Sequence, residues 1–226
     1  MDSDWPPRDF GSTLAGRLSR KHCVPHIPRF LSLLLFLMPL AAAAVDSDWQ
    51  YEGVERVVAI SDIHGDYGAM VATLENAGVI DSELDWSGGE THLVIVGDIL
   101  DRGPGSRAAM DLLIKLEPQA ADAGGKVHVL IGNHEAMNLT GDLRYVAAEE
   151  YAAFAADETA GQRAHWQRVY SARAAASGRP LGESEFDSRF PAGFFAHRQA
   201  FRADGKYGKW LLTKPVMVVV NRIAYV

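Results

Sequence analysis

Residues 57–66 read Val57-Val58-Ala59-Ile60-Ser61-Asp62-Ile63-His64-Gly65-Asp66. The first four are small or β-branched apolar residues, a run that is typical of a short buried strand. The run ends in a loop that carries acids, a histidine and a glycine. A helix is expected next, with Met70, Val71 and Leu74 on one face and Gly78 at its end. This unit of strand, polar loop and helix is the one from which we expect the fold to be built.

The same unit occurs twice more along the chain. A strand at 92–96 leads into the loop 97–104, after which Ser106 is expected to cap a helix, and a strand at 127–131 leads into the loop 132–135. Parallel strands joined by helices place their carboxyl ends at one edge of a sheet, where open α/β sheets bind ligands. The sequence therefore predicts an α/β fold in which three distant loops meet.

The remainder of the chain is expected to be helical and then extended. Residues 142–205 are rich in Ala, Glu and Arg, and we expect a helical insert that covers one side of the site, interrupted at Gly161 and at 178–180. Its aromatic residues recur at helical spacing: Tyr151, Phe154, Trp166 and Tyr170. Two late strands are expected at 216–220 and 223–226, with a turn between them.

The three loops together carry ligands for divalent metal ions. The donors are the carboxylates of Asp62 and Asp98, the imidazole of His64 and the amide oxygen of Asn133. Such a set suits Mn²⁺, Fe or Zn²⁺. Two cations about 3.5–4 Å apart can hold a bridging hydroxide and clamp both the attacking and the leaving oxygen of a displacement at phosphorus. We therefore expect a two-metal site for phosphoester hydrolysis.

Three further loop residues fit the same reaction. Arg102 offers a planar fork for two phosphate oxygens. His134, beside the ligand Asn133, can protonate the leaving oxygen as a general acid. Asp101 can hold the other ring nitrogen of His134 and keep the imidazole protonated. Each motif alone is weak, but all three fall in order at near-equal spacing, each after a β-run, which makes coincidence a poor explanation.

The charge distribution and the first 44 residues limit where the protein acts. The net charge is −7 with no long basic run after residue 30, so we expect no nucleic-acid partner. A basic flank, then the uncharged apolar run 30–44 ending in alanines, is typical of a secretory signal peptide. An uncleaved anchor is the alternative, although the run is short for a membrane span. We expect cleavage near Ala44, a periplasmic or secreted protein, and no stable membrane association afterwards.

Cysteine chemistry can be set aside. Cys23 is the only cysteine of the chain, and it lies within the predicted signal peptide. A thiolate nucleophile for phosphoester cleavage is therefore excluded in the mature protein.

These motifs resemble the signatures of a known family. Residues 62–65 (DIHG), 97–103 (GDILDRG) and 132–135 (GNHE) resemble the three motifs of the phosphoprotein phosphatase superfamily, within the calcineurin-like metallophosphoesterases. The longer string GNHEAMNLTGDLRYV at 132–146 is most similar to the Shewanella-like phosphatases. The resemblance implies a β-sandwich flanked by helices in place of a simple open sheet.

The resemblance also implies the ligand set. Asp62, His64 and Asp98 would hold the first metal, and Asp98 and Asn133 would belong to the second. Phosphate binding by Arg102 and acid catalysis by His134, supported by Asp101, are implied in the same way. The domain is expected to span residues 45–226.

The chain departs from the family after this point. The family supplies two further histidines to the second metal, one of them in a His-Gly-Gly motif directly after a strand, and a later phosphate-binding arginine. His165 and His197 have no Gly-Gly after them and are expected to be surface or packing residues. We therefore expect a C-terminally truncated domain in which the second cation binds weakly.

The sequence thus favours an exported metal-dependent phosphomonoesterase that acts on phosphorylated proteins or small phosphoesters. A dinucleoside tetraphosphatase-like nucleotide hydrolase is one alternative. An inactive truncated relative that binds one metal or none is the other.

Overall fold

The computed structural model describes residues 49–226, and the expected signal peptide at 1–44 lies outside the described residues. Within the described part of the chain, no helix combines the length and the apolar character that a membrane span requires.

A parallel three-stranded sheet forms the centre of the molecule. Its strands are β2 (Val57–Ile60), β3 (His92–Ile95) and β4 (Lys126–Val129), in the order β2-β3-β4, with Val57 opposite His92 and His92 opposite Lys126. The strands begin and end within two residues of the predicted positions. Their loops leave from the carboxyl ends on one edge, as the repeated strand, loop and helix pattern predicted.

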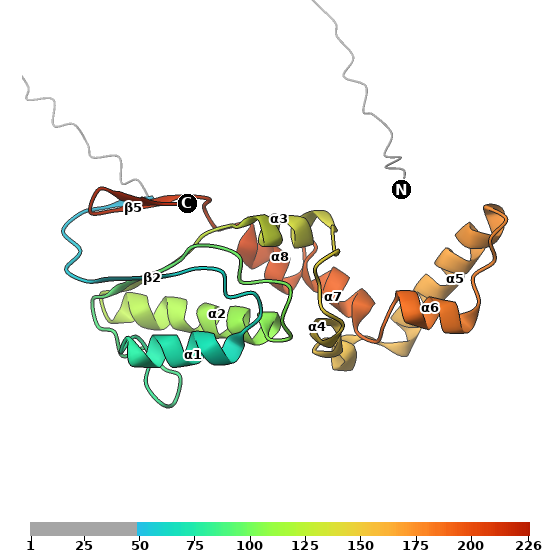
Figure 1. Cartoon of the computed structure of the whole chain (residues 1–226), viewed down its shortest axis with the longest axis horizontal. Coiled ribbons are helices and arrows are strands. Elements are labelled where there is room, and N and C mark those ends of the chain that lie inside the picture. Colours follow the sequence, from blue (N-terminus) through green and yellow to red (C-terminus); the bar gives the residue numbers. More distant parts are fainter. Residues whose placement is uncertain (1–48) are drawn as a thin grey trace, which may run out of the picture. The chain divides into compact units, whose positions relative to one another are not determined.

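Two helices cover one face of this sheet. They are α1 (Tyr67–Asn76) and α2 (Ser106–Asp122), which lie side by side below β2 in Figure 1. Met70 and Leu74 of the predicted apolar face of α1 are buried. They pack in one hydrophobic core with Leu93 and Ile95 of β3. Because α1 and α2 return the chain to the start of the next strand, β2, β3 and β4 run in the same direction.

A second sheet covers the other face. It contains β1 (Gln50–Tyr51), β5 (Val218–Val220) and β6 (Ile223–Tyr225), in the order β1-β5-β6. Val218 and Val220 pack against Val94 and Leu130 of the central layer, which Figure 1 shows between β5 above and the helices below. The expected sandwich flanked by helices is therefore confirmed, although β5 begins at Val218 and not at the predicted residue 216.

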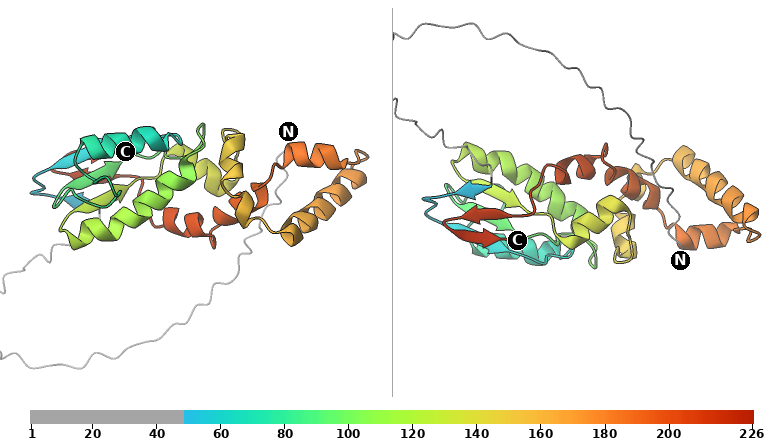
Figure 2. Two further views of the ribbon diagram at one scale, coloured as in Figure 1. Left: turned by 90° about the horizontal axis from the view of Figure 1, so that it is seen from below. Right: turned by 90° about the horizontal axis from the view of Figure 1, so that it is seen from above.

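The remaining helices gather at the carboxyl-terminal end of the central strands (Figure 2). They are α3 (Asn133–Thr140), α4 (Ala148–Ala152), the 3₁₀ helix η1 (Ala155–Asp157), α5 (Ala160–Ala176), α6 (Glu183–Arg189), α7 (Phe194–Ala200) and α8 (Lys206–Leu211). Phe186, Phe190 and Phe195 form a separate aromatic core with Trp166 and Tyr170 against it.

Two local expectations were wrong. Gly161 does not interrupt the insert, because it lies in the first turn of α5, whose cap is the side chain of Thr159. A glycine is tolerated there because the first-turn N–H groups have no helical partners to lose. Ser106 does not cap α2, since the cap position belongs to Gly105, and its buried hydroxyl instead accepts the N–H of Asp101 at 3.2 Å.

Candidate active site

The first two strand-terminal loops are joined by their main chains. The N–H groups of His64 and Gly65 donate to the carbonyls of Asp98 and Ile99, both at 2.9 Å, and Gly105 N–H donates to the Gly65 carbonyl at 2.9 Å. A side chain on Gly65, whose φ is +70°, would overlap the backbone of Gly103. The first two loops therefore fit together only because glycine allows this approach.

The first loop differs from its expected conformation. Asp62 and His64 were expected in an extended segment with both side chains on one side, but they have φ values of 52° and 47°. The side chains meet all the same, with Nε2 of His64 3.6 Å from Oδ1 of Asp62. The opposite ring nitrogen of His64 lies 3.1 Å from the carbonyl of Leu100, which fixes the orientation of the imidazole. The tight turn, and not strand alternation, brings the pair together.

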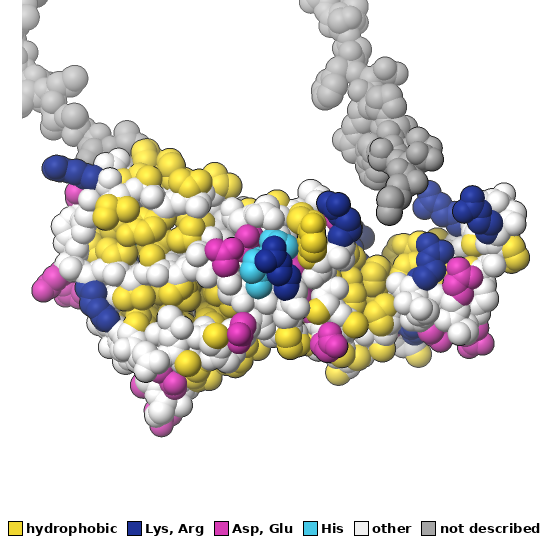
Figure 3. All heavy atoms as spheres, in the orientation of Figure 1, with side chains coloured by type: hydrophobic (Ala, Val, Ile, Leu, Met, Phe, Trp, Pro, Cys, Tyr) yellow, Lys and Arg dark blue, Asp and Glu magenta, His cyan; other side chains and the backbone are white. Residues whose placement is uncertain are grey.

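A candidate metal centre lies where the loops meet. His64, Asp98 and His134 each offer one ligand atom, and these atoms all lie within 4.8 Å of one another. Two imidazoles and a carboxylate are a donor set that suits Mn²⁺, Fe or Zn²⁺. Figure 3 shows this cluster of histidine, acidic and basic side chains on one face of the molecule.

The other two predicted ligands lie at the edge of this group. The side chain of Asp62 is 67% exposed and reaches the group through its approach to His64. Asn133 is the exposed first residue of α3, directly before His134. The structure thus brings the three ligand-bearing loops together and adds His134, which the sequence placed at the substrate.

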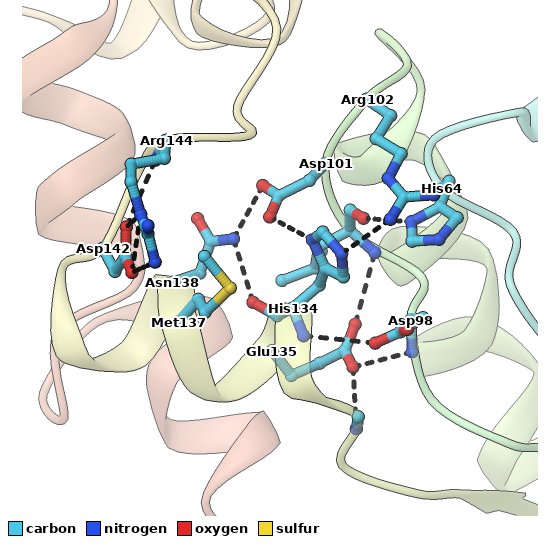
Figure 4. Close-up of polar contacts among 12 residues, drawn as sticks. His64, Asp98, Asp101, Arg102, His134, Glu135, Met137, Asn138, Asp142 and Arg144 are labelled. Atoms are coloured by element: carbon cyan, nitrogen blue, oxygen red, sulfur yellow. Dashed lines mark hydrogen bonds and ion pairs between the residues drawn. The ribbon is translucent and has the colours of Figure 1, made fainter.

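A buried pair orients His134. Its Nδ1 lies 2.6 Å from Oδ2 of Asp101, and both side chains are almost completely buried. The other oxygen of Asp101 accepts a hydrogen bond of 2.8 Å from Asn138 Nδ2, which also donates to the carbonyl of His134. Since Nδ1 is engaged, Nε2 is the ring nitrogen that faces the site (Figure 4). The pair expected from the sequence is therefore in contact.

Arg102 lies over the histidines. Its Nη2 is 3.4 Å from Nε2 of His134, and the residue is exposed. Its φ is 67°, and its N–H donates to the carbonyl of Tyr145 at 2.9 Å. The ring of Tyr145 lies 5.3 Å from that of His134. An exposed guanidinium beside a candidate metal centre is well placed to meet an anion.

Glu135 is a site residue for which the sequence analysis predicted no role. Its buried carboxylate accepts N–H bonds of 2.8, 2.9 and 3.2 Å from Asp98, Ile99 and Leu100, and a fourth of 2.9 Å from Gly132. Burial raises the pKa of this carboxyl group, and the backbone donors oppose the shift because they favour the ionised form. One side chain thus holds the second loop against the third.

The sequence analysis also predicted no role for Asn138. The sequence does contain a spacing that points to each of the two residues, Glu135 and Asn138. Glu135 follows Gly132 by three residues, the spacing at which a helix's first turn reaches back to the residue before it. Asn138 is four residues after His134, so the two lie on one face of α3.

Two histidines outside the site behave as the sequence predicted. His165 is exposed and lies against the edge of Trp166. His197 is fully buried among Tyr151, Phe154 and Phe201, with Nε2 3.6 Å from a carboxylate oxygen of the equally buried Glu150.

Comparison with known proteins decides the family. The sequence model that describes calcineurin-like phosphoesterases matches residues 55–191, which include all three loops. The chain belongs to the calcineurin-like phosphoesterase family. The chain is 36% identical to Shewanella-like protein phosphatase 2 of Arabidopsis thaliana over 176 residues, which are 76% of the chain and 45% of the relative.

Two further relatives agree. Shewanella-like protein phosphatase 1 of Plasmodium berghei is 34% identical over 99 residues, 44% of this chain and 27% of the relative. The crystal structure of a cold-active protein-tyrosine phosphatase of a psychrophilic Shewanella species matches with a TM-score of 0.53 and 32% identity, over 77% of this chain and 42% of that one. The predicted resemblance to the Shewanella-like phosphatases is confirmed. The chain spans less than half the length of each of these relatives.

Proposed function

We propose that the protein hydrolyses phosphomonoesters with the help of two divalent cations and acts on phosphorylated proteins. The observation that carries the proposal is the meeting of the three loops, with ligand atoms of His64, Asp98 and His134 within 4.8 Å of one another and Arg102 beside them. Membership of the calcineurin-like phosphoesterase family supports the reaction class.

The cations would be held by Asp62, His64, Asp98 and Asn133, which leaves Nε2 of His134, the third donor atom of the cluster, free to carry a proton. When bound, they would polarise the phosphoryl oxygens and lower the pKa of water, so that a water oxygen attacks phosphorus while the ester P–O bond breaks. The donor set does not select between Mn²⁺, Fe and Zn²⁺.

The chain's own residues would bind the substrate and move a proton. Arg102, exposed over the site, would bind two oxygens of the phosphoryl group. His134 would donate the proton on Nε2 to the leaving alkoxide or phenoxide oxygen, which carries the electron pair of the broken bond. Asp101 would position the ring through Nδ1, at 2.6 Å. Charge would thus be balanced at both ends of the reacting bond.

The substrate class rests on the relatives. Two relatives are named protein phosphatases, and the Shewanella structure is titled a protein-tyrosine phosphatase. We therefore place phosphotyrosine peptides first among the substrates to assay, with phosphoserine peptides and diadenosine tetraphosphate beside them. Release of phosphate from the peptides alone would separate a protein phosphatase from a nucleotide hydrolase. The predicted signal peptide supports action outside the cytoplasm.

The decisive experiment combines metal binding with turnover. Mn²⁺ is titrated into the metal-free full chain by calorimetry, and phosphate release is measured at saturating Mn²⁺. We expect Asp98→Asn to lose both, while Asp122→Asn, at the exposed end of α2, keeps both. A wild-type chain that binds no Mn²⁺ and releases no phosphate would support the inert alternative. Unchanged activity in Asp98→Asn would overturn the proposed centre.

A further inference from the structure

A cavity lies beside the carboxyl-terminal end of α3, apart from the candidate metal centre. It has a volume of about 290 Å³, and its lining includes three aromatic side chains, a glycine and two arginines: Trp166, Tyr170, Phe195, Gly141, Arg198 and Arg202. The rings of Trp166 and Phe195 are stacked at 10° with centroids 5.8 Å apart. None of these residues belongs to the candidate metal centre.

Arg198 is the unusual member of this cavity. It is half-buried, and its Nη1 donates to the carbonyl of Asn138 at 2.9 Å. Among residues 49–226, no carboxylate lies within ion-pair distance of its guanidinium. Burial lowers the pKa of Arg198, and the nearby Tyr151 and Tyr170 offset this only in part, since no carboxylate of the described chain is paired with the guanidinium.

Arg163 is a partly buried arginine that, unlike Arg198, has carboxylate partners. It lies between Glu158 at 2.8 Å and Asp187 at 2.6 Å. Burial lowers its pKa, but these carboxylates outweigh burial and raise the pKa overall. Buried charges are usually paired. The contrast indicates that Arg198 lacks a carboxylate that a ligand can supply.

The position of the cavity relates it to the reaction centre. Helix α3 begins at the site with Asn133 and His134 and ends at Thr140, and the following residue, Gly141, lines the cavity. The helical rise of 1.5 Å per residue places His134 and Gly141 about 10 Å apart along the axis of α3. An extended peptide covers that distance in about three residues. In Figure 3, hydrophobic side chains occupy the face between the histidine cluster and the end of the molecule that carries α6.

We propose that this cavity binds an acidic side chain of a phosphorylated polypeptide substrate, about three residues from the phosphorylated residue. Arg198 would pair with the carboxylate, Arg202, whose Nε already lies 3.2 Å from Asp204, would add a second positive charge beside it, and the aromatic side chains of the lining would cover the aliphatic part of the acidic side chain. The inference rests on the proposed function, because it assigns the specificity of the same site. It names the class of peptide that the protein prefers.

The test uses pairs of phosphotyrosine peptides on the full chain. In each pair, a Glu three residues before or after the phosphotyrosine is replaced by Gln. We expect kcat/KM to be about tenfold higher for the acidic peptide of at least one pair, the effect of one charge-assisted contact. In Arg198→Gln and in Arg202→Gln the ratio should fall towards one. Arg168→Gln, an exposed arginine of α5 that does not line the cavity, should keep the wild-type ratio.

The ratio separates specificity from catalysis. Arg198 also contacts Asn138, so its replacement can slow both peptides, but a general loss of rate leaves the ratio unchanged. A ratio of one in the wild type at both positions, or a ratio that survives both variants, would overturn the proposal.

A binding measurement makes the test independent of turnover. Calorimetry with the unphosphorylated peptides should show tighter binding of the acidic member to the wild type and no difference in Arg202→Gln. If no peptide and no p-nitrophenyl phosphate is hydrolysed but this preference persists, the proposed function fails and the cavity assignment stands. Equal binding of both peptides would reject the cavity assignment whatever the activity.

Discussion

Nδ1 of His134 lies 2.6 Å from Oδ2 of Asp101, and neither side chain is more than 2% exposed. A carboxylate this close fixes both the tautomer and the direction of the ring. Because Asn138 holds the other oxygen of Asp101, the pair has little freedom to rotate. The reactive nitrogen of His134 is therefore set by two residues that do not themselves reach the surface.

Replacement of Asp101 by Asn should lower activity with little change of fold. The amide can no longer hold the imidazole in its present tautomer, and we expect kcat/KM on p-nitrophenyl phosphate to fall about 100-fold, the value of one general acid. The control is Asp122→Asn, which should retain wild-type kinetics. Wild-type kinetics in Asp101→Asn would show that the pair has no part in proton transfer.

Replacement of Glu135 by Gln should destabilise the protein. The amide offers one acceptor oxygen where the carboxylate serves four backbone N–H groups, so two or more buried donors lose their partner. We expect the free energy of unfolding to fall by about 3 kcal/mol in urea denaturation. Glu149→Gln, at an exposed position of α4, is the matched control and should be neutral. Equal midpoints for the two variants would contradict the proposed clamp.

A pair of glycine variants should separate steric overlap from backbone strain. Gly53 and Gly65 both have positive φ, +73° and +70°, but a side chain on Gly53 meets nothing within 4 Å, whereas one on Gly65 meets Gly103. Gly53→Ala should cost about 1 kcal/mol, from conformation alone. Gly65→Ala should cost about 3 kcal/mol or more and reduce metal binding, since the loops must separate. Similar melting temperatures for both would be inconsistent with the close contact.

Stability should depend on pH through a histidine pair at the opposite end of the sheet. Nε2 of His128 lies 2.9 Å from Nδ1 of His92, under the ring of Tyr51. Burial, and then the charges of His92 and Lys126, lower the pKa of His128 to about 3. The unfolded chain binds this proton near pH 6.5. Stability is therefore complete above pH 6.5 and is lost as the pH falls towards 3.

Between pH 6.5 and about 3, the titration of His128 should change the free energy of unfolding by about 1.4 kcal/mol per pH unit. Denaturation at a series of pH values measures it. His128→Gln should lose this part of the slope, while His165→Gln, at an exposed position, should keep it. A slope that is the same in both variants would place the responsible group elsewhere.

Much of the architecture followed from local patterns. The three apolar runs form β2, β3 and β4. The polar loops that follow them meet at one edge, because parallel strands place their carboxyl ends at the same edge of the sheet. The expectation failed where the outcome depended on contacts between distant segments. The two-residue strand β1 has no periodic signal and exists only because Gln50 and Tyr51 pair with Val219 and Val220.

The site shows the same division. Asp98, Asp101 and His134 could be found because motif spacing records their chemistry. The spacing of Glu135 from Gly132 was visible in the sequence, but its three bonds to the backbone of 98–100 were not, because backbone partners in another loop leave no trace in the pattern of side chains. The left-handed turn at Asp62 was missed for a related reason, since it is fixed by hydrogen bonds to the Asp98 loop.

The hydrogen bonds between the Glu135 carboxylate and main-chain amides have a consequence for protein engineering. Every residue except proline owns such an amide, so the hydrogen bonds from Glu135 to residues 98–100 do not depend on which side chains these residues carry. An exchange of Asp98 for Glu or His would keep the backbone bond to Glu135, but it would displace the carboxylate oxygen that accepts the N–H of His134 at 3.1 Å. Proline at any of the three positions would remove one of these amides and leave the buried carboxylate of Glu135 with one donor fewer.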